Sequence, residues 1–523
     1  MHFAIFQLAL STLVLGPGDG DSSEAKTYSG RAADNEVATP ALDRAQIDID
    51  GRLDDAAWQQ AALLTSFTQF RPVEGVEASE RTEVRVLVDA EAIYFAIMAF
   101  DSDPSGIRAT LAERDSYTRS DDYVRLILDT FDDARRAYVF TVNPLGVQHD
   151  GIWNEGGGSA GRRHGNYGQP IDDNPDFLWD SDGAITEWGY QVEVRVPFKS
   201  LRFPEAEQQS WGLHVQRRIQ RSGFESSWAP ITANVSNKLT QAGKLNGLRN
   251  LDPGLFMELN PVLTGKRIGE FNAADGLFRR QDPSGDFGLN ATYGVTSNLT
   301  LDATYNPDFS QIEADAGQIA VNERFALFFP EKRLFFLEGT EIFGMAKQII
   351  YTRSVANPIA GAKLTGKLGS LNVGYLGAID QSFDAGAANT VVNLVRVRQD
   401  VGAASTIGAV YTDRTIGANN FNRVAGADAR FALNQRYTLT MIGAASFTDN
   451  PGLTSRATGS MLSAKIERAG RAVSFNAELE DTDANFDAGS GFFRRIGDTQ
   501  FNSHFQYNWF GERGALVQEV GPS

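Results

Sequence analysis

The 523-residue chain contains no cysteine. This absence excludes disulfide bonds, thiolate metal sites and a cysteine nucleophile. Basic residues are in the minority, at 48 Lys and Arg against 66 Asp and Glu, which gives a net charge of −18. Because binding to a phosphate backbone requires basic patches, this balance argues against nucleic acid as a partner. Only five histidines occur, and none begins the HExxH motif of zinc proteases.

A hydrophobic run long enough for a transmembrane helix is also missing. The extended apolar run from Phe3 to Gly16 is shorter than the roughly 20 residues that such a helix requires. It predicts a secretory signal peptide over residues 1–20, although no Lys or Arg precedes it. Residues 21–45 are rich in small and polar residues and predict a flexible linker. The length of the remaining chain predicts two or three domains.

Short strand patterns between turn signals fill residues 46–250. Thr82 to Val88 alternates, with its valines on one face, and Tyr190 to Val196 alternates in the same way. Ala92 to Phe100 is almost entirely apolar, as a central strand would be. Trp58 lies on the apolar face of a short predicted helix and is expected to anchor the core. These patterns predict a β-sandwich.

Longer alternating segments follow over residues 251–523. In one of them Leu301 and Tyr305 share a face, while Thr300 and Asp302 share the other. Segments of about ten residues suit tilted strands that cross a bilayer, with polar faces lining a wet lumen. The predicted fold class is therefore all-β, with a β-sandwich followed by an antiparallel transmembrane β-barrel. The absence of a terminal aromatic residue predicts a barrel that is incomplete at the C-terminus.

The stretch from Asn306 to Gly344 interrupts the alternation. It mixes phenylalanines such as Phe335, Phe336 and Phe343 with many charged residues. Such a mixture cannot face lipid, because unpaired charges at membrane depth are costly. Leaving so many phenylalanines in water would also be costly. We therefore expect residues 306–344 to form an ordered plug in the lumen or a segment at the periplasmic mouth.

Two motifs resemble known families. The pieces NPDFSQIEADAGQI (306–319) and RFALFFPEKRLFFLEG (324–339) resemble an outer-membrane barrel family, the domain of unknown function 5916. IDGRLDDAAW (49–58) resembles the start of carbohydrate-binding module family 9-like domains. The resemblance implies a Gram-negative outer-membrane protein with a periplasmic or surface-exposed N-terminal domain. It also implies a carbohydrate or glycan ligand and contact with outer-membrane lipid.

A sugar site requires aromatic faces together with amides or carboxylates. The candidate ligand-binding residues are Asp150, Trp153, Asn154, Glu155 and Trp179. The alternative interpretation places Trp153 and Trp188 in the core. No cofactor is predicted, although residues 172–176 and 180–183 carry clustered carboxylates that suit calcium without the full spacing of a calcium loop.

Three functions remain open from the sequence. The first is a non-enzymatic protein that binds a glycan or a related ligand, with passage of that ligand through the barrel as a further option. The second is a glycoside hydrolase, or its subunit, acting on O-glycosyl bonds in carbohydrate catabolism. That chemistry needs two carboxylates about 5–10 Å apart, and no constellation singles out such a pair, so no catalytic residue is predicted. The third is a structural protein of the cell envelope.

Overall fold

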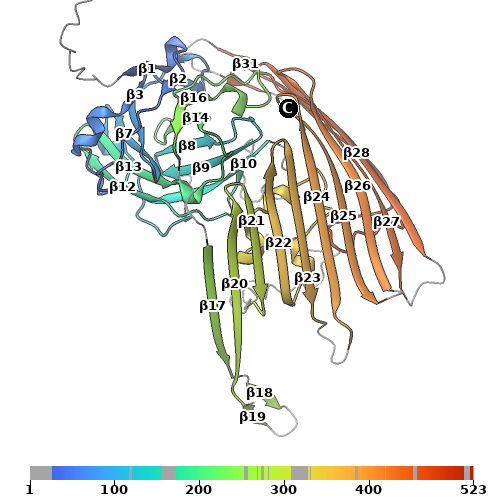
Figure 1. Ribbon diagram of the computed structural model, residues 1–523. Helices are drawn as coiled ribbons and strands as arrows, with labels where there is room; N and C mark the ends of the chain where they lie inside the picture. Colours follow the sequence, from blue (N-terminus) through green and yellow to red (C-terminus); the bar gives the residue numbers. More distant parts are fainter. Residues whose placement is uncertain are drawn as a thin grey trace, which may run out of the picture.

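The chain forms two β-structures that lie side by side, a sandwich and a large curved sheet (Figure 1). The computed structural model describes residues 26–116, 120–155, 171–173, 175–251, 257–267, 269–272, 276–280, 282–307, 328–329, 331–382, 387–417, 420–450, 456–511, 517 and 519–521. Within these ranges, no helix is long and apolar enough to cross a membrane. The predicted signal peptide, residues 1–20, falls outside them.

The sandwich consists of two sheets. The first has the strand order β1-β3-β6-β7-β13-β12. Its strands are β1 (Thr27–Ser29), β3 (Ala62–Thr65), β6 (Thr82–Val88), β7 (Ala92–Phe100), β12 (Asp180–Thr186) and β13 (Gly189–Pro197). The second has the order β11-β10-β9-β8-β14-β15-β4-β5, with β16 and β2 beside β14. Its strands are β2 (Glu36–Ala38), β4 (Thr68–Arg71), β5 (Val76–Glu77), β8 (Tyr123–Asp129), β9 (Arg136–Val142), β10 (Gln148–Asn154), β11 (Ile171–Asp172), β14 (Gln208–Ile219), β15 (Phe224–Ser227) and β16 (Gly243–Arg249).

Alternating apolar residues build the sandwich core, as the sequence predicts. Val84, Val86 and Val88 on β6 are buried between the two sheets. Leu87 points to the opposite face of β6, where Trp58 covers it in a second apolar cluster. Trp58 lies on the 3-10 helix η2 (Ala56–Gln60) and is 2% exposed, so it is a core anchor.

The predicted flexible linker over residues 21–45 is wrong from Thr27 onward. Strand β1 pairs in parallel with β3, and β2 pairs in parallel with β16. Tyr28 and Val37 are fully buried in the sandwich core. Each apolar side chain stands alone among small and polar residues, which is why composition suggested a linker. One buried residue per strand nevertheless fixes a short strand to an existing sheet edge.

The second half forms one antiparallel sheet of twelve described strands, in the order β17-β20-β21-β22-β23-β24-β25-β26-β27-β28-β29-β30. The strands are β17 (Met257–Lys266), β20 (Ser284–Thr296), β21 (Leu299–Tyr305), β22 (Pro358–Leu368), β23 (Leu371–Asp380), β24 (Thr390–Val401), β25 (Ser405–Gly417), β26 (Asn420–Ala432), β27 (Tyr437–Asp449), β28 (Ala457–Arg468), β29 (Val473–Thr482) and β30 (Asp498–Tyr507). Two hairpins stand apart, β18 (Gly269–Asn272) with β19 (Leu277–Arg280) and β31 (Trp509–Phe510) with β32 (Glu519–Val520). Among the described residues β17 does not pair with β30, so the sheet is curved but not closed.

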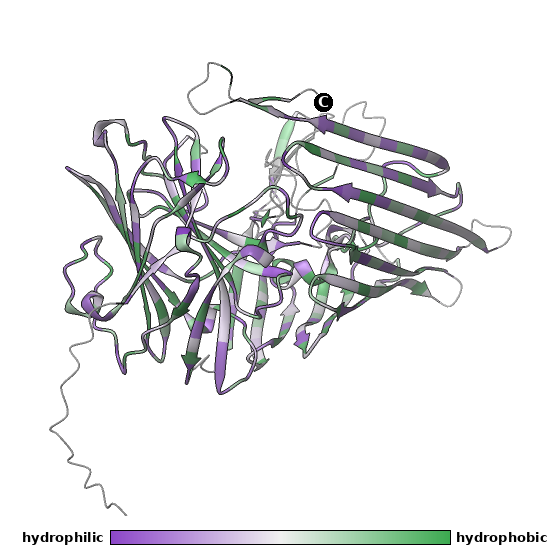
Figure 2. Ribbon diagram, turned by 90° about the horizontal axis from the view of Figure 1, so that it is seen from above, coloured by the Kyte–Doolittle hydropathy of each residue, from purple (hydrophilic) through white to green (hydrophobic). Residues whose placement is uncertain are grey.

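The two faces of the large sheet differ in the predicted way. Thr300, Asp302 and Thr304 on β21 point to the concave side and are buried, whereas Leu301 and Tyr305 are 40% and 56% exposed. Figure 2 shows hydrophilic and hydrophobic residues alternating along these strands. Large apolar side chains remain exposed on many of the strands, namely Tyr293, Tyr375, Ile379, Val391, Ile407, Tyr411, Phe447, Leu462, Leu479, Phe501 and Phe505.

The concave face is covered by a short segment that we call the plug, residues 331–355. It contains α2 (Leu334–Leu337), η7 (Thr340–Phe343) and η8 (Thr352–Ser354). Phe335, Phe336 and Phe343 are buried against apolar side chains of β23 to β28. The predicted wet lumen is therefore wrong for the middle of this face, because the plug rather than water covers it. Residues 308–327 and 330 of the predicted ordered stretch lie outside the described residues.

Candidate functional site

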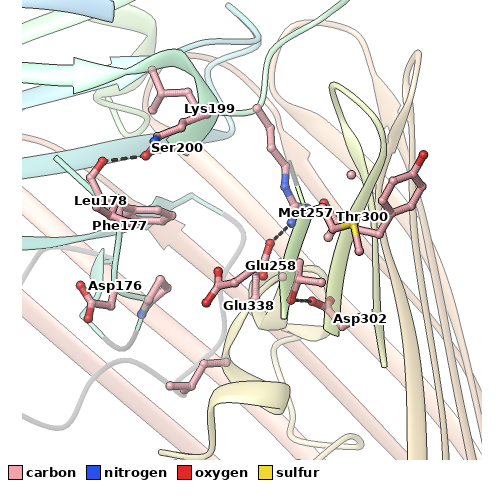
Figure 3. A pocket seen from close by; sticks show the side chains of 18 of the residues that line it. Asp176, Phe177, Leu178, Lys199, Ser200, Met257, Glu258, Thr300, Asp302 and Glu338 are labelled. Atoms are coloured by element: carbon pink, nitrogen blue, oxygen red, sulfur yellow. Dashed lines mark hydrogen bonds and ion pairs between the residues drawn. The ribbon is translucent and has the colours of Figure 1, made fainter. Parts of the chain in front are cut away.

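A cavity of about 930 Å³ lies where the sandwich, the large sheet and the plug meet (Figure 3). The sandwich contributes the loop before β12 and the residues around η5 (Phe198–Ser200). The large sheet contributes the ends of β17, β20 and β21, and the plug contributes residues near η7. The cavity therefore exists only because the two halves of the chain are docked.

The sandwich wall combines an aromatic ring with exposed polar and apolar groups. Phe177 packs edge-on against Tyr138, with 5.1 Å between ring centroids. Ser200 Oγ donates a hydrogen bond of 2.6 Å to the carbonyl oxygen of Leu178, which fixes the two loops to each other (Figure 3). Lys199 and the Leu178 side chain remain exposed. This wall offers both an apolar surface and a cation.

The opposite wall consists of polar side chains from the first strands of the large sheet. Thr292 Oγ1 donates a hydrogen bond of 2.9 Å to Asp302 Oδ1. The other oxygen of Asp302 lies 3.3 Å from Lys363 Nζ. Glu258 on the edge strand β17 is exposed to the cavity. Hydroxyl and carboxylate groups therefore face the sandwich across the cavity.

Two ion pairs close the cavity on the plug side. Arg202 Nη2 donates to Glu338 Oε1 at 2.5 Å, and Arg136 Nη1 lies 2.8 Å from Glu341 Oε1. Both arginines belong to the sandwich and both glutamates to the plug. Carboxylates and guanidinium groups beside an apolar ring suit a ligand with many hydroxyl groups, because such a ligand both donates and accepts.

The structure places the two predicted tryptophans in the interior. Trp153 is 2% exposed and donates from Nε1 to Glu155 Oε1 at 3.0 Å. Trp179 is 3% exposed and packs edge-on against Phe140 at 5.2 Å. Neither ring offers a free face, so the prediction that they form a stacking platform for sugar is wrong. The alternative, that Trp153 and Trp188 belong to the core, is correct for Trp153 and wrong for Trp188, which is 36% exposed.

Asp150 is buried too, but it supports the cavity wall. Its carboxylate accepts a hydrogen bond of 2.9 Å from Arg114 Nη2 and one of 2.6 Å from the backbone N–H of Phe177. Burial raises the pKa of Asp150 to about 6. Arg114 and Phe177 both line the cavity. Asp150 therefore positions two lining residues without facing the cavity itself.

Asn154 and Glu155 lie at the junction between the two halves. Asn154 Nδ2 donates to the carbonyl oxygen of Glu341 in the plug at 3.3 Å. The Glu155 carboxylate lies 3.7 Å from Arg430 on β26, and burial raises the pKa of Glu155. The five predicted residues are thus not brought together as a ligand site. Three of them instead connect the sandwich to the cavity wall, the plug and the sheet.

The carboxylates proposed for calcium have protein partners. Asp176 lies 2.6 Å from Arg114, and Asp180 lies 3.0 Å from Arg195. Oxygens of Asp115, Asp150 and Asp176 come within 4.8 Å of one another, but Arg114 contacts all three residues. Calcium binding at residues 172–176 and 180–183 stays a prediction.

Sequence reasoning missed most of the cavity. Its residues come from distant parts of the chain, and none forms a motif. The only available signal was the pair of glutamates in LEGTEIFG (337–344), whose charges stand beside phenylalanines and therefore require partners.

Solved structures of low sequence identity resemble parts of the chain. One is a carbohydrate binding module family 9 from Caldicellulosiruptor kristjanssonii in complex with cellotriose, with 15% identity, a TM-score of 0.28, and coverage of 40% of this chain and 92% of that chain. Another is OccAB3 from Acinetobacter baumannii, with 9% identity, a TM-score of 0.25, and coverage of 85% and 97%. TM-scores this low support neither a ligand nor a location.

A family match is found within the second half of the chain. Among curated proteins, none matches this sequence. Residues 271–369, from hairpin β18–β19 through the plug to β22, match the family described as Domain of unknown function (DUF5916). The match includes the two pieces that carry the resemblance, and so confirms the chain's resemblance to the DUF5916 family over this region.

Proposed function

We propose that this protein resides in the outer membrane and binds a glycan in the cavity between its sandwich and its large sheet. The observation that carries the binding proposal is the cavity itself. It is large enough for a small oligosaccharide or a similar ligand, since ligand pockets commonly measure about 300–1,000 Å³. Its lining supplies hydroxyl groups, carboxylates, guanidinium groups and an aromatic ring.

The convex face of the large sheet supports the membrane location. Its exposed side chains include Leu462 at 59%, Phe501 at 68% and Phe505 at 58%. A soluble protein rarely exposes so extended an apolar surface. Apolar residues outside and polar or covered residues inside are the arrangement of a membrane barrel.

The connections between strands support a periplasmic position for the sandwich. Short turns follow β22, β24, β26 and β28. At the other end of the sheet, the connections at residues 381–389, 450–456 and 483–497 are longer, and the one at residues 418–419 is short. The sandwich contacts the short turns, since Arg135 Nη2 donates to the Gly402 carbonyl at 2.7 Å and Ser236 N donates to the Gln435 carbonyl at 2.6 Å. In bacterial outer-membrane barrels the short turns are periplasmic.

The test is calorimetric binding of a glycan library to the full chain in detergent. Glu258→Ala and Lys199→Ala remove charged groups from opposite walls. Among the described residues neither group forms an ion pair, and Glu258 only accepts a hydrogen bond from Asn260 on its own strand. Each is expected to weaken binding of a ligand by about 10-fold. Trp188→Ala is the matched control, because Trp188 is 36% exposed beside Phe100 and lies in the turn between β12 and β13, at the opposite end of that hairpin from the cavity residues Leu178 and Lys199.

The outcomes separate the three functions that the sequence left open. Saturable binding that the two cavity variants weaken supports the proposal. Loss of binding in Trp188→Ala alone places the ligand on the far end of the sandwich and contradicts it. Turnover of the glycan favours the hydrolase, and the absence of binding to any glycan favours a structural role.

A further inference from the structure

A second, much smaller pocket lies beside the cavity, at the same junction. Its volume is about 20 Å³, which suits one particle of the size of a water molecule. The lining comes from the sandwich, the turn end of the large sheet and Ile342 of the plug. A sugar, a phosphate or a carboxylate group is too large for this space.

Cationic side chains dominate the lining of this pocket. The five are Arg135, Arg136, Arg202, Lys367 and Arg398. Carboxylates pair with four of them. Lys367 contacts Asp133 and lies 2.8 Å from Asp400, which also lies 3.4 Å from Arg135. Arg136 lies 2.8 Å from Glu341, and Arg202 lies 2.5 Å from Glu338. Five positive charges thus face four negative charges within the described residues, which leaves an excess of one.

Arg398 is the one of these five cations without an ion pair among the described residues, although the carboxylates of Asp400, Asp133 and Asp428 act on it electrostatically. It is 8% exposed, and its side chain forms no hydrogen bond or ion pair with any described residue. Asn372 contacts Arg398 only at its backbone carbonyl. The neighbouring inward arginine, Arg396, instead forms two bonds to Asp428, of 2.6 and 2.9 Å. An unpaired guanidinium at this depth is costly, because burial removes its hydration without replacing it.

Unused hydrogen-bond donors gather around the same pocket. Arg398 Nε, Arg136 Nε and Arg202 Nη1 are buried without an acceptor among the described residues. All three residues line the pocket. An acceptor in the pocket would lie among lining residues of both the sandwich and the large sheet.

We propose that this pocket binds one monovalent inorganic anion of about the size of chloride, held by Arg398, Arg136 and Arg202. The pocket volume limits the size of the ion. The excess of one positive charge indicates an ion of charge −1, and the N–H donors in the lining favour an anion over a cation. Because Arg136 and Arg202 belong to the sandwich and Arg398 to β24, the anion strengthens the docking of the two halves. This site shares Arg136 and Arg202 with the wall of the glycan cavity, but it does not depend on glycan binding.

The test follows thermal unfolding of the full chain in detergent while chloride replaces gluconate at constant ionic strength. We expect the Tm of the wild-type protein to rise by about 2–4 °C and then to saturate. Arg398→Gln removes the excess charge and is expected to abolish this rise. Arg423→Gln is the matched control, since Arg423 pairs with Asp413 on the same sheet with its side chain 42% exposed, and it should keep the rise.

Two results overturn the proposal. One is a wild-type Tm that is equal in chloride and gluconate, and the other is a chloride-dependent Tm that persists in Arg398→Gln. If Arg398→Gln does not fold, wild-type crystals soaked in bromide decide the question. An anomalous peak between Arg398, Arg136 and Arg202 supports the site, and the absence of a peak there excludes it.

Discussion

The sandwich and the large sheet use the same alternation of residues for opposite purposes. On β6 the alternating valines Val84 and Val86 are fully buried between two sheets. On β21 the alternating apolar residues Leu301 and Tyr305 are exposed, and the polar ones are inside. The large sheet obtains an apolar interior only where the plug supplies Phe335 and Phe336. A period of two therefore predicts a strand, while the partner of each face decides which side chains are buried.

The largest contrast is expected from phenylalanine truncation in the two regions. Phe140 is fully buried between Tyr138 and Trp179, whereas Phe501 on β30 is 68% exposed. Phe140→Ala should lower the free energy of unfolding of the sandwich by about 3–5 kcal/mol. Phe501→Ala should change the stability in detergent by about 0.5 kcal/mol or less. Denaturant unfolding measures the stability of both variants. Equal losses of stability in the two would contradict the expected difference between the sandwich and the convex face of the sheet.

The interior of the large sheet should depend on the plug. Phe336 is 1% exposed and packs on Phe335 at 4.9 Å. Phe336→Ala is expected to destabilise the docked plug by roughly 3 kcal/mol, so that its amides exchange about 100-fold faster. Hydrogen exchange across residues 331–355 measures this. Phe505→Ala on the convex face is the control, and equal acceleration in both variants would contradict a core supplied by the plug.

The free energy of unfolding of the sandwich should depend on pH through Glu193. This carboxylate accepts hydrogen bonds from Trp58 Nε1 and from the backbone of Asp50 and Gly51. Burial raises the pKa of Glu193 from 4.5 to about 7. The folded sandwich thus holds this proton more tightly than the unfolded chain does. The resulting stability is complete below pH 4.5 and is lost as the pH rises through about 7.

Glu193→Gln is therefore expected to reduce the fall in sandwich stability between about pH 5 and pH 7. Some of the fall should persist, because burial also raises the pKa of Asp129 to about 7 and that of Asp150 to about 6. Unfolding followed by tryptophan fluorescence at several pH values measures the slope. Glu91→Gln, at a carboxylate whose side chain is 81% exposed, should leave the slope unchanged. If the stability of Glu193→Gln falls with pH as steeply as that of the wild type, titration of Glu193 does not cause the fall.

The smallest effect is expected at the boundary between the two regions. Glu338 pairs with Arg202, but its side chain is 40% exposed, so solvent screens the pair. Glu338→Gln should cost about 0.2–1 kcal/mol. Faster hydrogen exchange confined to residues 335–341 is the expected signature. Glu467→Gln, which removes a similarly exposed pair with Lys465, should leave that segment unaffected.

The strands could be predicted from the sequence because each depends on local alternation. Thr82–Val88 and Ala92–Phe100 were predicted with the bounds that the structure shows. The site could not be predicted in the same way. Trp153 and Trp179 are chemically suited to sugar, but only the pairing of β9 with β10 and the position of Phe140 show that their faces are covered. Arg398 likewise becomes distinctive only when its neighbours across the junction are known.

The contacts of Glu341 should make any release of the plug cooperative, because they join the plug to two strands of the sandwich. Its side chain contacts Arg136 on β9, its backbone carbonyl accepts from Asn154 on β10, and the adjacent Ile342 is 4% exposed. A gradual tilt of the plug would break one of these contacts while straining the others. We therefore expect a displacement of the sandwich to release these contacts of the plug together rather than one at a time.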